Sequence, residues 1–366
     1  MLHAAARESH QRAVILLRSR RMGNSVAGYS IAKLHGLNHL LRMVSRSFYL
    51  SIRVLPHQIR SQVGLAYVLA RATDTVADSH SVPADLRYAV LLRMRDEIAA
   101  AAAGDAVRPA EPVNLSCHLA EMDRALLESF PDALAVLRNF GQADRQRIGD
   151  VLETITSGQE MDLSRFGQAA SGHIAALDTE EELDLYVCRV AGCVGEFWTK
   201  MCRAHLFPKA TVNEDSLVEN GVRLGKGLQL VNILRDLPRD LRQGRCYIPR
   251  ERLAESGLSP ESLLDPGGME AFRSLYNHFL ARAEACLAAG RVYVEELPRG
   301  QIRIRFGCTL PRLIGLETLA RLRSGNVLDN RHRIKVSRSE VRRLILASLG
   351  QCLRPKRVRP ETGPCC

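Results

Sequence analysis

The sequence predicts an all-α protein built around one large helical domain. Ala, Leu, Arg and Glu dominate the 366 residues, and the alternation of Val, Ile or Thr with polar residues that is typical of strands is scarce. The middle of the chain has no change in composition and no repeat that would divide it. We therefore expect a single domain at 34–330, between a basic extension at 1–33 and a basic tail at 331–366.

Four long segments carry the helical pattern, taken in chain order. In 86–103 the apolar side chains Leu86, Val90, Leu91, Met94 and Ile98 share one helix face. A polar patch at 104–112 that contains proline ends this helix. Further helices are expected at 139–157, 181–206 and 270–297.

The net charge of +11 is unevenly distributed. Residues 1–53 hold nine basic residues against Glu8, and residues 331–366 hold ten against two acids, so each end nets +8 and the middle nets −5. Basic ends suit an anionic membrane surface, although ordinary solvated charge explains them equally well. The Arg-rich, acid-poor start also has the composition of a transit peptide. Nucleic acid is not expected as a partner, because no recognition motif accompanies the charge.

Two further features bear on location. No apolar run approaches about 20 residues, so no membrane-spanning helix is expected. The ten cysteines are scattered without a CxxC pair or zinc-site spacing. Without a signal peptide, this pattern is typical of reduced thiols in the cytoplasm.

Two acidic segments carry the candidate chemistry. Asp74 and Asp78 are one helical turn apart, where like charges repel unless a cation lies between them. Asn232, Asp236 and Asp240 also recur every four residues, although Pro238 is expected to kink or end their helix.

Such oxygen-rich stripes would suit Mg²⁺ if they faced each other. Mg²⁺ is bound by one or two carboxylates and takes its remaining oxygens from water and substrate phosphates. Arg71 and Arg235 adjoin the acids and are expected to clamp the same phosphates. The alternative is a pair of solvated helix faces with intrahelical ion pairs.

Five segments in this order resemble the squalene/phytoene synthase family of head-to-head prenyl transferases. They are SRSFYL at 45–50, ATDTVAD at 72–78, SGQEMDL at 157–163, YVCRVAGCVG at 186–195 and GKGLQLVNILRDLPRDLRQGRCYIP at 225–249. The resemblance implies an isoprenoid-synthase fold with a central cavity. It also implies that the two acidic motifs face each other and hold Mg²⁺ and two prenyl diphosphates.

The resemblance assigns roles to further residues. Ser45, Arg46 and Ser47 would contribute to the diphosphate pocket, and Tyr186 would lie near the departing diphosphate and the carbocations. Gln159 and Gln229 are candidate cavity residues, and Val190 and Val194 either line a channel for the alkyl chains or belong to the core.

The product is less defined than the family. The segment 302–311 is similar to bacterial-type squalene synthases, which favours squalene made from two farnesyl diphosphates through presqualene diphosphate, with NADPH as reductant. Phytoene, dehydrosqualene or presqualene diphosphate are the alternatives without reduction. A different class, an assembly factor related to these synthases, is disfavoured because the aspartates of both motifs are present.

Overall fold

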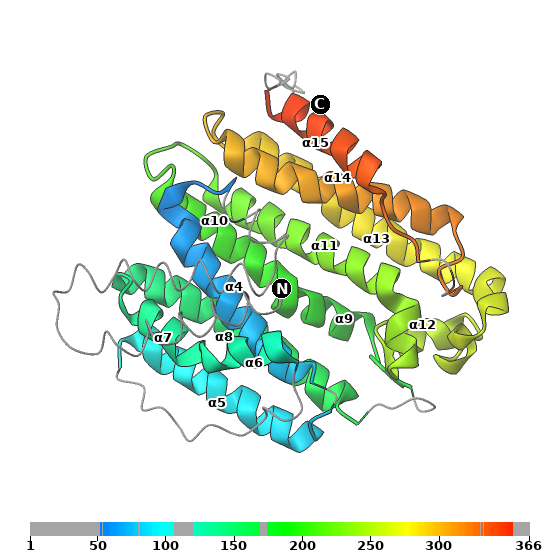
Figure 1. The fold of residues 1–366 in the computed structure, drawn as a ribbon. Helices are drawn as coiled ribbons and strands as arrows, with labels where there is room; N and C mark the ends of the chain where they lie inside the picture. The colour runs from blue at the N-terminus through cyan, green and yellow to red at the C-terminus, as the bar shows by residue number, and fades with distance from the viewer. Residues whose placement is uncertain are drawn as a thin grey trace, which may run out of the picture.

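The computed structural model describes residues 52, 54–79, 81–105, 120–168, 174–329, 331 and 333–353, most of them in helices (Figure 1). The predicted all-α class is confirmed. The described part of the chain contains one pair of strands, β1 (Ala175–Ala176) and β2 (Arg245–Cys246), which are parallel and two residues long. The 1–33 extension and the transit-like start lie outside the described residues.

The first group of helices surrounds α8. Its members are α4 (His57–Ala77), α5 (Ala84–Ala103), α6 (Glu121–Glu128), α7 (Phe130–Arg138) and α8 (Gln142–Phe166). Both α4 and α5 pack against α8. Helix α5 ends where Gly104 adopts a left-handed conformation with φ of 100°, close to the predicted end. Helix α8 runs nine residues beyond the expected end at 157, so that prediction is wrong.

The second group is centred on α11. It comprises α9 (Glu180–Val187), a π-helical turn at Cys188–Gly192, α10 (Cys193–His205), α11 (Glu214–Arg242), α13 (Met269–Glu296), α14 (Ile302–Ser324) and α15 (Arg338–Leu353). Helix α11 packs between α10 and α13, and α14 and α15 form successive outer layers (Figure 1). Short turns lie beside them: α12 (Arg250–Glu255) and 3₁₀ turns at Glu261–Leu264 and Pro266–Gly268.

The predicted helix at 181–206 corresponds to α9, the π turn and α10, which follow one another without a gap. The predicted helix at 270–297 corresponds closely to α13, whose aromatic residues Phe272, Tyr276, Phe279 and Tyr293 are almost fully buried. Among the described residues, no helix combines the length and the apolar character that a membrane span requires.

Pro238 does not end α11, which contradicts one of the two outcomes expected for it. The helix continues through Pro238 to Arg242. A proline has no backbone N–H, so the carbonyl of Leu234, four residues earlier, loses its usual donor. The buried Tyr276 hydroxyl donates to this carbonyl oxygen at 3.0 Å and replaces the missing hydrogen bond. This contact from α13 lets the second acidic motif remain helical across the proline.

Tyr276→Phe is expected to lower the free energy of unfolding by about 1–3 kcal/mol, because it leaves the buried Leu234 carbonyl without a donor. Pro238→Ala restores a backbone N–H at that place, so the double variant should recover most of the loss. Urea unfolding followed by circular dichroism measures both changes. Additive effects of the two substitutions would show that Tyr276 does not compensate for the proline.

Candidate active site

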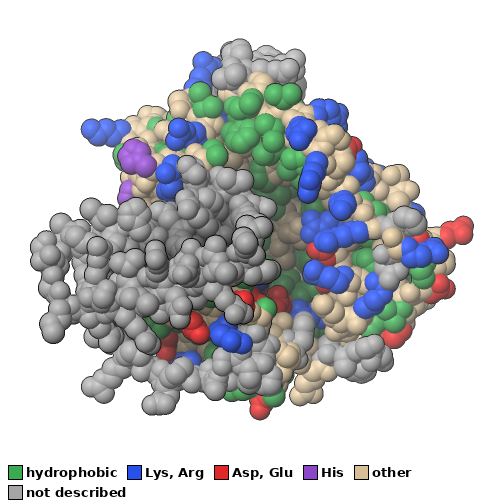
Figure 2. Space-filling view, in the orientation of Figure 1, with side chains coloured by type: hydrophobic (Ala, Val, Ile, Leu, Met, Phe, Trp, Pro, Cys, Tyr) green, Lys and Arg blue, Asp and Glu red, His purple; other side chains and the backbone are tan. Residues whose placement is uncertain are grey.

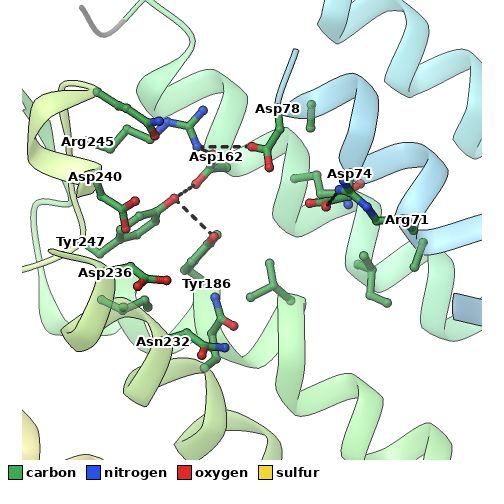
Figure 3. Close-up of a pocket in the computed structure, with 18 of the residues that line it drawn as sticks. Arg71, Asp74, Asp78, Asp162, Tyr186, Asn232, Asp236, Asp240, Arg245 and Tyr247 are labelled. Carbon is green, nitrogen blue, oxygen red and sulfur yellow. Dashed lines mark hydrogen bonds and ion pairs between the residues drawn. The ribbon is translucent and has the colours of Figure 1, made fainter. Parts of the chain in front are cut away.

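A cavity of about 570 Å³ opens between α4, α8, α9 and α11. Most of the residues predicted from the sequence line it: Asp74, Asp78, Gln159, Tyr186, Val190, Val194, Gln229, Asn232, Asp236, Asp240 and Arg71. The two acidic motifs lie on different walls, with the Tyr186 and Tyr247 rings between them (Figure 3). The helical spacing of each motif therefore brings its carboxylates into one shared space.

The first acidic motif lies on the inner face of α4. The Arg71 guanidinium donates to the Asp74 carboxylate at 2.5 Å and lies 3.8 Å from the carboxylate of Asp123 on α6. Burial raises the pKa of Asp74 to about 6; repulsion from Asp78 adds to the rise, and Arg71 opposes it. A cation bound beside Asp74 would stabilise the charged carboxylate and so oppose the effects of both burial and Asp78.

The second acidic motif lies on α11 and is surrounded by arginines. Arg235 donates two hydrogen bonds to Asp236, at 2.9 and 2.7 Å, and Arg333 lies 3.2 Å from the same carboxylate. Burial opposes ionisation of Asp236, but the Arg235 hydrogen bonds hold its pKa below the ordinary value. Burial raises the pKa of Asp240 to about 6, Arg239 opposes this rise, and Asp236 adds to it.

Arg235 does not take the place expected for it. The described residues that line the cavity include Arg71, Arg239 and Arg245 but not Arg235. Its guanidinium is committed to the neighbouring Asp236. Ser45, Arg46 and Ser47 lie outside the described residues.

In the metal-free protein, Asp240→Asn is expected to raise the free energy of unfolding by about 3 kcal/mol above pH 6. The carboxyl holds its proton more tightly folded, with a pKa of about 6, than unfolded, with an ordinary value of 3.8. Stability is therefore lost as pH rises between these values, and the advantage of the Asn variant appears over the same window.

Asp236→Asn supplies the matched control, with the opposite sign. Its pKa is lowered in the fold, so the charged form is stabilising at neutral pH and its removal should destabilise the protein. Urea unfolding in EDTA at pH 4 to 8 measures both variants. A shift of both variants in the same direction would contradict these local environments.

A third set of polar groups links Tyr186 to the first acidic motif through Tyr247, Asp162 and Arg245, three residues that the sequence reasoning missed. Tyr186 donates to the Tyr247 hydroxyl at 3.5 Å, and Tyr247 donates to Asp162 at 2.5 Å. Arg245 then lies 3.3 Å from Asp162 and 3.5 Å from Asp78 (Figure 3). The network runs from the candidate catalytic tyrosine to the first acidic motif.

The burial of this network determines its protonation. Burial, followed by the nearby Asp162 charge, raises the pKa of Tyr186 well above its ordinary value, so the phenol stays neutral. Burial also raises the pKa of Asp162, while Arg245 and Tyr247 oppose that rise. The rings of Tyr186 and Tyr247 stack with centroids 5.0 Å apart, which fixes the orientation of both hydroxyls.

The π turn at Cys188–Gly192 sets which side chains face the cavity. Tyr186, Val190 and Val194 all line it, although positions eight apart in a regular α-helix drift by about 80°. The wider turn reduces this drift. Behind it, a Cβ on Gly195 would lie 2.0 Å from the Gly221 carbonyl oxygen, so this glycine serves close helix packing.

The donor set suits Mg²⁺ better than a metal held by protein alone. Among the residues that the structure describes, no three carboxylate, His or Cys side chains converge on one point. Each wall instead offers a pair of carboxylates beside arginines that can bind phosphate. One carboxyl of each pair, Asp74 on the first wall and Asp240 on the second, has a raised pKa. Mg²⁺ characteristically uses one or two carboxylates and takes further oxygens from phosphate and water.

Comparisons with known proteins give matches over most of the chain. The family model for squalene/phytoene synthase matches residues 41–340. The presqualene diphosphate synthase of Rhodopseudomonas palustris is 31% identical over 269 residues, which cover 74% of this chain and 79% of the relative. The squalene synthase of Schizosaccharomyces pombe is 27% identical over 314 residues, covering 85% and 64%.

A bifunctional lycopene cyclase/phytoene synthase of Phaeosphaeria nodorum is 31% identical over 287 residues. The match covers 75% of this chain and 45% of that relative, so the chain spans less than half of the bifunctional protein. Among solved structures, a TcSQS complex with the ligand E5700 aligns with a TM-score of 0.71 at 22% identity, covering 88% and 89% of the two chains. That likeness supports the isoprenoid-synthase fold.

Proposed function

The chain belongs to the squalene/phytoene synthase family, and from this premise we propose that it joins two prenyl diphosphates head to head. The observation that carries the proposal is one cavity with paired aspartates on two opposite walls and a neutral tyrosine between them. Two acidic walls suit two diphosphate groups, one at each motif. The proposed substrate is farnesyl diphosphate.

Asp74 and Asp78 on one wall, and Asp236 and Asp240 with Asn232 on the other, would hold Mg²⁺. When bound, the metal would neutralise the negative charge that develops on the departing diphosphate. Arg71 and Arg239 line the same space and would bind the diphosphate oxygens directly. Ser45, Arg46 and Ser47 remain proposed diphosphate ligands.

The other residues that line the cavity would keep water away from the carbon atoms that react. Val190, Val194 and Ile233 provide an apolar surface for the prenyl chains. Tyr186 keeps its proton and presents an oriented hydroxyl dipole to the reacting groups. Gln229 supplies an amide beside Asn232 at the same wall. Together these residues would exclude water from a carbocation while the diphosphate leaves.

We infer squalene as the product, with hydride supplied by NADPH. We assign no described residues to a nicotinamide, so this part of the proposal rests on the resemblance of 302–311 to bacterial-type squalene synthases. The alternatives are presqualene diphosphate, dehydrosqualene and phytoene. The proposed location is the cytoplasm, with the basic ends of the chain against an anionic membrane that receives the lipid product.

Incubation with farnesyl diphosphate and Mg²⁺, with and without NADPH, followed by hydrocarbon analysis, tests the product. We expect squalene only when NADPH is present. Presqualene diphosphate or dehydrosqualene despite NADPH would replace squalene by one of the alternatives. Turnover confined to geranylgeranyl diphosphate would indicate phytoene, and no turnover of either substrate would favour the assembly-factor class.

A further inference from the structure

The outward face of α15 combines leucines and arginines. Its inward face is buried on α14 through Leu344, Ser348 and Cys352, which recur every four residues. On the other face, Leu346 is 71% exposed and Leu349 is 41% exposed. Leu346 is the most exposed large hydrophobic side chain in the described part of the chain.

The stripe that carries Leu346 and Leu349 also carries positive charge. Arg338 and Arg342 are exposed, and Arg342 lies one turn before Leu346 on the same stripe. Arg343, on another face of the helix, lies 3.4 Å from Glu317 of α14. The acid of the helix, Glu340, is paired with Arg321 of α14. Figure 2 shows hydrophobic side chains gathered over α14 and α15 with Lys and Arg beside them. A helix face with exposed leucines and adjoining arginines complements a surface that is both apolar and anionic.

The helix is also connected to the cavity. The segment that precedes α15 carries Arg333, which reaches Asp236 of the second acidic motif at 3.2 Å. Arg321 of α14 also holds this segment, because its guanidinium donates a hydrogen bond to the Lys335 carbonyl oxygen at 2.9 Å. The segment that leads into α15 therefore contacts one wall of the candidate active site.

We propose that α15 is the element that docks this protein on an anionic bilayer. Leu346 and Leu349 enter the boundary between headgroups and acyl chains, and Arg338 and Arg342 on the same stripe contact lipid phosphates. This contact rests on the proposed function, which places the protein at an anionic membrane, and it identifies α15 as the surface that meets the lipid. It commits to lipid because exposed leucines and arginines lie along one stripe, so the leucines can enter the acyl boundary while the longer arginine side chains reach lipid phosphates.

Sedimentation of the full-length protein with vesicles tests the assignment. We use phosphatidylcholine vesicles with or without phosphatidylglycerol, and expect binding only when phosphatidylglycerol is present. The double variant Leu346→Ser/Leu349→Ser should reduce vesicle binding by about tenfold or more. Arg342→Gln should weaken binding several-fold at low salt and less at high salt.

Matched controls separate the surface from general effects. Leu264→Ser removes a leucine that is 44% exposed on a distant 3₁₀ turn, and Lys209→Gln removes an exposed charge between α10 and α11; neither should change binding. Undiminished binding by the double leucine variant would overturn the proposal. So would a dimer, seen by sedimentation velocity, that this variant dissociates while vesicle binding persists.

The two proposals fail in different ways. Prenyl diphosphate turnover without vesicles should be the same in the double leucine variant and the unmodified protein, because neither leucine lines the cavity. Loss of vesicle binding with turnover intact supports docking through α15. Vesicle binding by a protein without turnover would leave docking in place and remove the proposed reaction.

Discussion

Asp74→Asn is expected to lower the rate of prenyl diphosphate consumption at saturating Mg²⁺ by about a thousandfold. The variant keeps the size of the side chain but removes the charge that would hold the metal against the departing diphosphate. Asn in place of a carboxyl with a raised pKa should leave the helical fold intact. Release of inorganic diphosphate measures the rate, and circular dichroism checks the fold.

Asp123→Asn is the control for this prediction. Asp123 also contacts Arg71, at 3.8 Å, but it is not among the described residues that line the cavity. Its removal should change the rate by less than about threefold, the scale expected for a partly exposed ion pair. A near-normal rate for Asp74→Asn at saturating Mg²⁺ would show that the first acidic motif does not hold the metal.

Arg245→Met is expected to be the most destabilising of the substitutions considered for the site. Arg245 is 9% exposed and neutralises Asp162, which is 14% exposed, while also contacting Asp78. Removing one partner of a buried pair leaves an uncompensated charge, which costs about 3–5 kcal/mol in the free energy of unfolding. The activity should fall as well, because Asp162 orients Tyr247 and, through it, Tyr186.

The double variant Arg245→Met/Asp162→Asn separates stability from activity. It removes the buried charge, so stability should largely return, whereas activity should remain low because the polar network is still altered. Urea unfolding and diphosphate release measure the two quantities. If the double variant is no more stable than Arg245→Met alone, Arg245 does not act by neutralising Asp162.

Periodicity predicted much of the fold because helices are local. The ends of α5 and α13 are fixed by nearby proline and glycine residues, and both helices lie close to the predicted ranges. Helix α8 continues beyond 157, and its packing there is close: a Cβ on Gly158 would lie 2.7 Å from a Val190 methyl group, so this position inside the helix is a tertiary contact point. The continuation of α11 past Pro238 depends on Tyr276, 42 residues away in sequence from the carbonyl it contacts.

The candidate site was likewise predictable where local helix spacing determines it, and not where distant segments meet. Asp74 with Asp78, and Asn232 with Asp236 and Asp240, were predictable because helical spacing alone aligns each set. Asp162 and Arg245 lie in segments already recognised at 157–163 and 225–249, but they are 83 residues apart and meet only when β2 is placed beside α8. Arg235 adjoins the motif in sequence, yet its guanidinium is held by Asp236.

The joining of two prenyl units is the central claim, and product mass tests it most directly. The protein is incubated with Mg²⁺, NADPH and an equal mixture of unlabelled and fully deuterated farnesyl diphosphate, and the lipid product is analysed by mass spectrometry. We predict three forms of a product containing two prenyl units: one from two unlabelled units, one from two deuterated units and one from a unit of each kind, with the mixed form the most abundant. Products containing a single prenyl unit, or no consumption of substrate, would contradict the assignment.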